Sequence, residues 1–189
     1  MSRTDNFFLK RRSVVAKKML SKPIDENDLK KIINAGIRVP DHGALNPWKI
    51  IVIKDDKLKT IDEEIILSEY KRENPNAGLQ NLEIETKRLQ RASVVLVVLS
   101  TPIEHPKISK WEMVLSSGAV CMNLLSCAQS LGYAAQWLTE WYAYNNKMLQ
   151  YLGGRPKIDQ ISGFIYIGHK VEEPTERRRP DPEKVIFYI

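Results

Sequence analysis

The hydrophobic positions of the chain fall into short continuous runs, which predict the strands of a sheet. Residues 49–54 and 93–100 are apolar at nearly every position, as is typical of strands buried on both faces. The second run is expected to lie at the centre of the sheet. Two further apolar segments, residues 133–137 and 160–168, predict additional strands.

Between these predicted strands, the apolar residues recur at the spacing of an α-helix. Asp25 is a typical N-cap residue, and apolar positions from Leu29 to Gly36 then share one face until Pro40 ends the helix. The remaining pattern predicts an amphipathic surface helix at residues 55–70, a mobile polar excursion at 71–78, and helices at 79–91 and 145–152.

The longest predicted helix, at residues 110–131, is apolar around its whole circumference. Small side chains at residues 116–119 would let another backbone approach closely. Such a helix forms either the core of a monomer or the spine of a dimer interface. Because a chain of 189 residues has limited room to bury it, we expect a dimer.

The last segment combines a polar stretch with an apolar end. Residues 174–181 are polar and flanked by prolines, whereas residues 185–189 are apolar and carry no polar tail. A free apolar strand is prone to aggregate, so this segment is expected to pair with a sheet edge. After so long a linker, the edge could belong to a second subunit, and residues 174–189 are predicted to be an arm that docks there.

Length and composition indicate one domain over residues 1–189, with 43% hydrophobic and 28% charged residues. The longest apolar run, residues 94–99, is too short to span a bilayer, and the first six residues lack the apolar core of a signal peptide. Cys121 and Cys127 point to different faces of one predicted helix. We therefore expect neither a disulfide nor a metal site, and a reducing cytoplasm.

The net charge of +6 would suit an anionic partner. The basic residues occur in short clusters, and no long polybasic tract with interleaved aromatic residues is present. A basic nucleic-acid-binding domain is therefore an alternative that the pattern does not favour. The clusters are residues 10–12, 17–18, 30–31 and 177–179.

Two segments carry more polar chemistry than a connector needs. The loop at residues 38–48 is stiffened by two prolines, and its Arg38, His42 and Asn46 supply hydrogen-bond donors. This combination is typical of a preformed site for a planar or anionic ligand. Residues 10–13 form either a solvated basic turn or an anion clamp, in which two guanidiniums and a hydroxyl bind a phosphate. No motif for a nucleotide-binding loop or a serine nucleophile is present.

With these pieces in place, the chain resembles the nitroreductase family of flavoproteins, particularly its small stand-alone branch. The resemblance covers nearly the whole length. It is carried by Arg11-Arg12-Ser13, by Arg38-Val39-Pro40-Asp41-His42 with Asn46-Pro47-Trp48, by residues 131–137, and by residues 163–168 with the arginines before the terminal strand. The resemblance implies an α+β fold with a mixed, mainly antiparallel central sheet flanked by helices. It also implies an intertwined homodimer with FMN at the subunit interface.

The resemblance further implies how FMN is held at its phosphate end. Arg11, Arg12 and Ser13 match the positions that bind the phosphate and the ribityl chain. An arginine before the terminal strand often reaches the same phosphate, which makes Arg177 and Arg179 candidates. Since FMN carries a dianionic phosphate, arginines are suitable partners.

At the ring end, the resemblance implies contacts from both subunits. Arg38 and His42 match flavin contacts made by the other subunit, and Trp137, Leu138 and Thr139 match the segment beside the flavin ring. The flat ring needs donors at its carbonyl groups and an apolar wall. Reduction places negative charge near N1 and C2=O, which a nearby donor would stabilise.

The function implied is that of an FMN-dependent oxidoreductase. NADH or NADPH would reduce the flavin at N5 and leave, and a nitroaromatic, quinone or similar electron-poor acceptor would then take its place in a ping-pong reaction. The flavin performs the chemistry, so no catalytic residue of the protein is expected. The alternative within the family is another reductive task, such as dehalogenation or the remodelling of a small metabolite.

One stretch departs from the family pattern. Relatives in this branch tend to have Trp-Arg-Ser/Thr-Gly where this chain has Trp137-Leu138-Thr139-Glu140. An arginine is lost and a carboxylate is gained beside the expected site. We expect this charge to discourage anionic substrates such as NADPH. Residues 127–132 match a region assigned to the nicotinamide nucleotide, so the electron donor is affected more than FMN.

Overall fold

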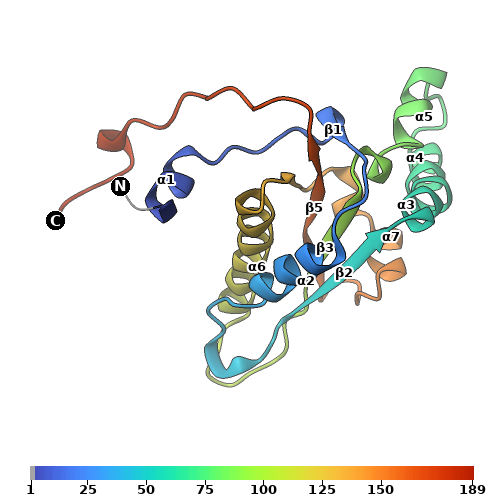
Figure 1. Cartoon of the computed structure of the whole chain (residues 1–189). Coiled ribbons are helices and arrows are strands. Elements are labelled where there is room, and N and C mark those ends of the chain that lie inside the picture. Colours follow the sequence, from blue (N-terminus) through green and yellow to red (C-terminus); the bar gives the residue numbers. More distant parts are fainter. Residues whose placement is uncertain (1–2) are drawn as a thin grey trace.

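The computed structural model describes residues 3–189 and centres on a five-stranded sheet with helices on both faces (Figure 1). Strand β3 lies between β5 and β2, and the other side of β5 pairs with both β1 and β4. Every pairing is antiparallel, which confirms the predicted sheet. The strands are β1 (Met19–Leu20), β2 (Trp48–Lys54), β3 (Val94–Ser100), β4 (Ala134–Leu138) and β5 (Gln160–Lys170).

Apart from α1, for which no helix was predicted, the helices also follow the predicted pattern, with shifted boundaries. They are α1 (Arg3–Lys10), α2 (Glu26–Gly36), α3 (Asp56–Ile61), α4 (Ser68–Glu73), α5 (Leu79–Glu85), α6 (Lys110–Ser130) and α7 (Asn146–Tyr151). Asp25 caps α2 as predicted, because its carboxylate accepts the backbone N–H groups of Asn27 and Asp28 at 2.9 and 3.0 Å. The helix ends at Gly36, four residues before Pro40.

The prediction that β2 is buried on both faces is wrong. Within residues 3–189, β2 pairs only with β3, so it forms one edge of the sheet, and Val52 is 40% exposed. β3 carries a similar apolar run, but every residue of it is buried because it has a neighbouring strand on each side. An apolar run alone does not distinguish these two positions in a sheet.

The predicted surface helix at residues 55–70 is longer and more deeply packed than expected. It runs through α3, a π-helical turn at Asp62–Leu67 and α4, and it buries Ile61, Ile65 and Ile66. The predicted excursion at residues 71–78 shrinks accordingly to a short turn, in which the Ala77 N–H donates to the Asn74 carbonyl at 3.0 Å.

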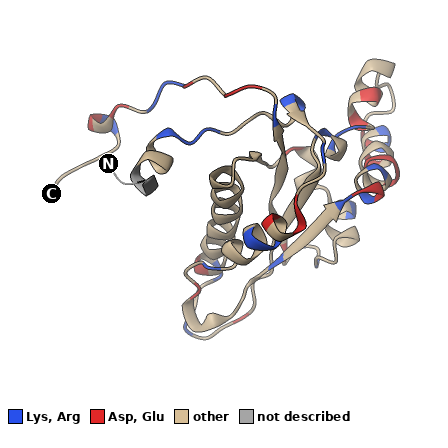
Figure 2. Ribbon diagram, in the orientation of Figure 1, with Lys and Arg blue, Asp and Glu red and all other residues tan. Residues whose placement is uncertain are grey.

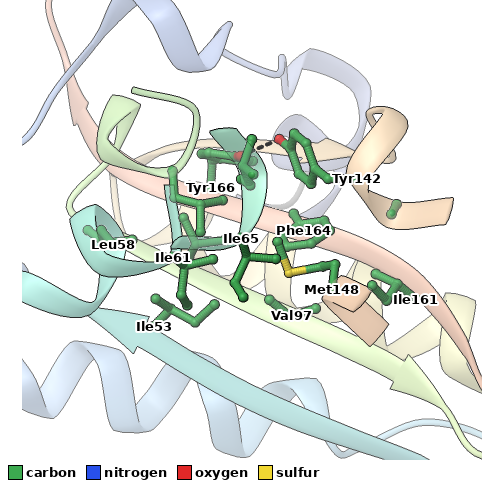
Figure 3. Packing of buried hydrophobic residues seen from close by; sticks show 14 of the residues in the cluster. Ile53, Leu58, Ile61, Ile65, Val97, Tyr142, Met148, Ile161, Phe164 and Tyr166 are labelled. Atoms are coloured by element: carbon green, nitrogen blue, oxygen red, sulfur yellow. Dashed lines mark hydrogen bonds between the residues drawn. The ribbon is translucent and has the colours of Figure 1, made fainter. Parts of the chain in front are cut away.

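The sheet separates two hydrophobic cores. One lies against α2 and α6 and includes Leu124, Ile165 and Ile167. The other lies against α3, the π-helical turn and α7, and its largest buried side chains include Phe164 and Tyr166 (Figure 3). Because successive strand residues face opposite sides, β5 contributes to both cores in alternation.

Helix α6 buries one face and leaves another uncovered. Cys121 and Leu124 are fully buried against the sheet. On the opposite side, Trp111 and Leu115 are 67% and 53% exposed, and a Cβ at Gly118 would meet no atom within 4 Å. By length and composition alone α6 could cross a membrane, a test that a core helix of a globular protein also meets. Its uncovered face agrees with the predicted dimer spine, which no second chain here tests.

The C-terminal segment leaves the body of the molecule after β5. It runs beside the segment that follows α1, and its end lies away from the sheet (Figure 1). Phe187 and Tyr188 are 79% and 95% exposed. Within one chain this segment pairs with no sheet edge along residues 171–189, so its docking onto a second subunit stays a prediction.

Candidate functional site

A cavity of about 910 Å³ lies where the N-terminal segment, α2, α6 and the start of the C-terminal segment meet. Arg11, Arg12 and Arg38 line it, together with Cys127 and Gln129 near the end of α6. Three of the arginines singled out in the sequence therefore converge on one space, although Arg38 is 26 positions from Arg12 in the chain.

Four arginines, Arg11, Arg12, Arg177 and Arg179, form a cluster beside this cavity. Burial lowers the pKa of Arg11 from its ordinary value, and the charges of Arg179, Arg12 and Arg177 lower it further. Figure 2 shows basic residues on both the N-terminal and C-terminal segments, which the Arg12 Nε joins by donating to a C-terminal backbone carbonyl at 3.0 Å. The mutual repulsion of these guanidiniums means that an anion would bind here favourably.

One carboxylate, Glu176, partly balances the arginine cluster. Its Oε1 lies 2.9 Å from Nη2 of Arg179 and 3.6 Å from Nε of Arg12. The arginines lower the pKa of Glu176, after a larger effect from the backbone N–H of Arg177. Since one carboxylate faces four guanidiniums, the cluster keeps a net positive charge.

Sequence reasoning missed the residue that holds the N-terminal segment in place. Gln129 donates from Nε2 to the carbonyl oxygens of Arg12 at 3.0 Å and Ala135 at 3.3 Å, and its Oε1 accepts from Nη1 of Arg11 at 3.3 Å. Ser13 lies on this held segment, next to the arginines. The signal in the sequence is an amide side chain in the last turn of an otherwise apolar helix.

The loop at residues 38–48 divides its candidate residues between two places. Arg38 reaches the cavity, and its carbonyl accepts from Nδ2 of Asn123 at 2.8 Å. His42 instead lies near the beginning of α6, where its Nδ1 is 2.8 Å from Oε2 of Glu112. Within one chain, Arg38 and His42 therefore do not form a single site.

Asp41, which was identified from the sequence only within the motif at residues 38–42, shapes this loop. Its carboxylate accepts the backbone N–H of Leu45 at 3.2 Å and of Asn46 at 2.8 Å. These bonds hold Ala44 and Asn46 at positive φ angles of 50° and 48°, which residues other than glycine rarely adopt. The Asn46 amide donates to the Ala44 carbonyl at 3.1 Å, so this predicted ligand donor is used within the loop itself.

The end of β4 and the next residue, Trp137–Thr139, form what we call the ring segment. The side chains of Trp137 and Leu138 point to opposite faces of the sheet, because they pair with Ile165 and Phe164 of β5. Trp137 is 37% exposed and donates from Nε1 to the Ser162 carbonyl at 3.0 Å. Leu138 packs against the core that contains Phe164, and Thr139 is exposed.

We predict that Gly163→Ala displaces Trp137. A Cβ at Gly163 would lie 2.0 Å from Nε1 and 2.4 Å from Cδ1 of Trp137, so the indole must move and lose its hydrogen bond. The expected cost is about 1–3 kcal/mol of unfolding free energy, as for other overpacked sites. Urea denaturation measures it, with quenching of tryptophan fluorescence as a local readout.

The matched control for this prediction is Gly78→Ala, because a Cβ at Gly78 would meet nothing within 4 Å. Its φ of −68° suits alanine, so the control should change stability by no more than about 0.5 kcal/mol. Equal effects of the two substitutions would contradict the proposed contact between Gly163 and Trp137.

The carboxylate that departs from the family pattern does not face the cavity freely. Nη1 and Nη2 of Arg91 donate to Oε1 and Oε2 of Glu140 at 3.1 and 2.8 Å, and the Tyr142 hydroxyl donates to Oε2 at 2.7 Å. Tyr142 in turn bonds the Tyr166 hydroxyl at 2.6 Å (Figure 3). The expectation that Glu140 places an uncompensated negative charge beside the site is therefore not supported.

We predict that Glu140 makes the stability of the protein fall in acid. Burial alone would raise its pKa, but the hydrogen bonds from Arg91 and Tyr142 outweigh burial and hold the pKa below the ordinary value of 4.5. Such a group stabilises the fold above its unfolded pKa, and this contribution is lost as the pH falls through the folded pKa. The difference in unfolding free energy between the wild type and Glu140→Gln should thus shrink below pH 4.5.

Urea denaturation at a series of pH values checks this prediction. The control is Glu83→Gln, which removes an exposed carboxylate whose only ion pair among the described residues is with Lys87. It should follow the wild type at every pH. A difference between the wild type and Glu140→Gln that stays constant from neutral to acid pH would contradict the prediction.

Comparison with known proteins gives a consistent result. The nitroreductase family model matches residues 9–169. The Escherichia coli K12 protein named "Putative NAD(P)H nitroreductase YdjA" is 26% identical over 167 residues, covering 85% of this chain and 86% of the relative. A Haemophilus influenzae relative whose name makes the same assignment is 25% identical over 177 residues, covering 92% and 93%.

Solved structures share the fold. A nitroreductase-like family protein from Bacillus cereus superposes with a TM-score of 0.83 at 19% identity, covering all of this chain and 97% of the other. A Desulfovibrio desulfuricans structure described as a complex with FMN superposes with a TM-score of 0.74 at 20% identity, covering 100% and 98%.

Proposed function

Because this chain belongs to the nitroreductase family, we propose that it is an FMN-dependent oxidoreductase that uses NADH or NADPH as electron donor. The names of the relatives support the donor. The Desulfovibrio desulfuricans structure supports the cofactor, as does a solved variant of the nitroreductase NfnB from Sphigopyxis sp. strain HMH, which is described as FMN and NADPH-dependent. The observation in this chain that carries the proposal is the arginine cluster beside the cavity.

The residues present fit the phosphate end of FMN. The arginine cluster offers guanidinium donors and a net positive charge, which suit a dianionic phosphate. Ser13 adds a hydroxyl on the segment that Gln129 holds. Arg11 and Arg12 would bind the phosphate directly, while Arg177 and Arg179 would close over it from the C-terminal segment.

The ring segment fits the other end of the cofactor. Trp137 would provide an apolar wall, Leu138 anchors the segment in the core on the opposite face of the sheet, and Thr139 would provide a hydroxyl and a backbone N–H beside the ring. When bound, FMN would supply the two-electron chemistry, taking hydride at N5 from NAD(P)H and passing it to a nitroaromatic, quinone or similar acceptor in a ping-pong reaction. The protein's part is to bind, to orient and to provide donors where negative charge develops.

The proposal includes a homodimer whose interface contributes to the site. The uncovered α6 face at Trp111 and Leu115 and the exposed C-terminal arm support it. His42 lies at the same end of α6 as Trp111, so a dimer built on this face would bring His42 near a second subunit. The role of Arg38 and His42 as flavin contacts from the other subunit, and a reducing cytoplasmic location, belong to the same proposal.

The test is cofactor uptake followed by turnover. The purified protein should be yellow with flavin absorbance, and it should oxidise NADH or NADPH in the presence of nitrofurazone or menadione. A colourless protein that takes up no FMN would contradict the proposal. A protein that binds FMN but ignores both nicotinamide donors would favour another reductive task of this fold.

A further inference from the structure

Glu140 directly follows the ring segment, and its side chain is held by Arg91, 49 positions earlier, and by the nearby Tyr142. Arg91 binds it through both guanidinium nitrogens, at 3.1 and 2.8 Å, and the Tyr142 hydroxyl donates to it at 2.7 Å. Two parallel bonds from one guanidinium fix the orientation of a carboxylate as well as its position. A fourth hydrogen bond comes from Nη1 of Arg88 at 3.3 Å, so a displacement of the Glu140 carboxylate would break four hydrogen bonds.

The other end of this contact is anchored in the core. Nη2 of Arg91 donates to the Tyr166 hydroxyl at 3.3 Å, and its guanidinium lies 5.0 Å from the centre of that ring. Leu89 and Gln90 donate their backbone N–H groups to the buried Asp62 carboxylate at 2.8 and 3.2 Å. Arg91 is thus held both by β5 and by the π-helical turn. Its hydrogen bonds to Glu140 therefore restrict the movement of that side chain.

The charges around Glu140 balance one another. Arg88 and Arg91 both contact it, and Arg88 also pairs with Glu85, with Nη2 and Oε1 2.5 Å apart. Two guanidiniums therefore face two carboxylates in a partly buried group. A balanced and fixed group of this kind suits a structural role better than the selection of substrates by charge.

We propose that Arg91 and Glu140 are positioning residues, which set the FMN affinity and the reduction potential of the flavin by locking the ring segment against the sheet. Donors act on a cofactor most strongly when they are held in place before it binds or is reduced. The inference rests on the proposed function, because the ring segment acts on flavin only if FMN binds beside it.

The test compares Glu140→Gln, Arg91→Gln and the double variant with the wild type. The measurements are the dissociation constant of FMN, the reduction potential of the bound flavin, and amide hydrogen exchange at Thr139 in the FMN-free protein. Each single variant should weaken FMN binding about tenfold or more, change the potential and speed the exchange. The double variant should bind FMN no more than about threefold more weakly than the single variant with the lower FMN affinity, because both changes break the same contact.

Two further variants make the comparison decisive. Glu83→Gln removes an exposed carboxylate in the same way and should match the wild type in all three measurements. Arg91→Lys keeps the charge but loses the bidentate hydrogen bonding of the guanidinium, so it should resemble Arg91→Gln in all three measurements. It can replace Arg91→Gln if that variant does not fold.

Three results would overturn the inference. Variants that bind FMN as tightly as the wild type, with unchanged reduction potential and amide exchange, would overturn this inference and leave the proposed function standing. A change restricted to the preference between NADH and NADPH would make Glu140 an electrostatic filter instead. A wild-type protein that binds no FMN overturns the proposed function, and this inference with it.

Discussion

Replacing Arg11 by glutamine is expected to weaken FMN binding about 100-fold, equivalent to about 3 kcal/mol. Burial and the charges of three neighbouring guanidiniums all lower the pKa of Arg11. A phosphate dianion would relieve this repulsion and accept charge-assisted hydrogen bonds, and both gains are lost with the charge. Fluorescence titration of the FMN-free protein with FMN measures the effect.

The fold should tolerate this substitution. Within the described chain, the side chain of Arg11 makes one hydrogen bond, to Gln129 at 3.3 Å, and its removal lowers the repulsion in the cluster. The matched control is Arg178→Gln, since this change removes the same charge and Arg178 lies between two members of the cluster in sequence. Equal losses of FMN affinity in the two variants would mean that only net charge matters, against a specific phosphate site.

Removing residues 185–189 is expected to convert a dimer into a monomer. Phe187 and Tyr188 are 79% and 95% exposed in one chain, and burial of such a side chain contributes about 1.5–3 kcal/mol. Two arms per dimer would thus be worth several kcal/mol, which raises the dissociation constant of the dimer by a factor on the order of 10³ or more. Analytical ultracentrifugation over a concentration series measures this change.

The truncation leaves the arginine cluster intact, so loss of FMN from the monomer would reveal the contribution of the second subunit. Leu79→Ser is the control, because Leu79 is equally exposed, at 86%, but lies on α5 and outside the arm. The unpaired edge at β2 is the expected acceptor of the arm. A truncated protein with an unchanged dissociation constant and unchanged amide protection in β2 would contradict this assignment.

The sequence allowed the central elements to be predicted because their signals are local. The apolar run of β3 and the N-cap at Asp25 need no knowledge of distant residues. β1, with two residues, has no signal of its own, since it exists only through its pairing with β5. The edge position of β2 was missed for the same reason, because its exposure depends on which strands lie beside it.

The candidate site shows the same limit more sharply. The arginines were identified through a resemblance. The contact that joins their two segments, from Arg12 to the Thr175 carbonyl, spans 163 positions and follows from the tertiary fold. The pairing of Glu140 was not foreseen, because its partner Arg91 lies 49 positions earlier in the chain. Gln129 and Asp41 hold backbone segments in place. In the sequence, a residue with such a role cannot be distinguished from any other polar residue.

The central place of β5 has a consequence for how the chain folds. β5 pairs with β1, β3 and β4, although it follows all of them in the sequence. Most of the sheet therefore cannot close until residues 160–170 have arrived, and the loops to be closed are long. Folding should be slow for a protein of this size, with the pair of β2 and β3 able to form early and both cores completed together in one late cooperative step.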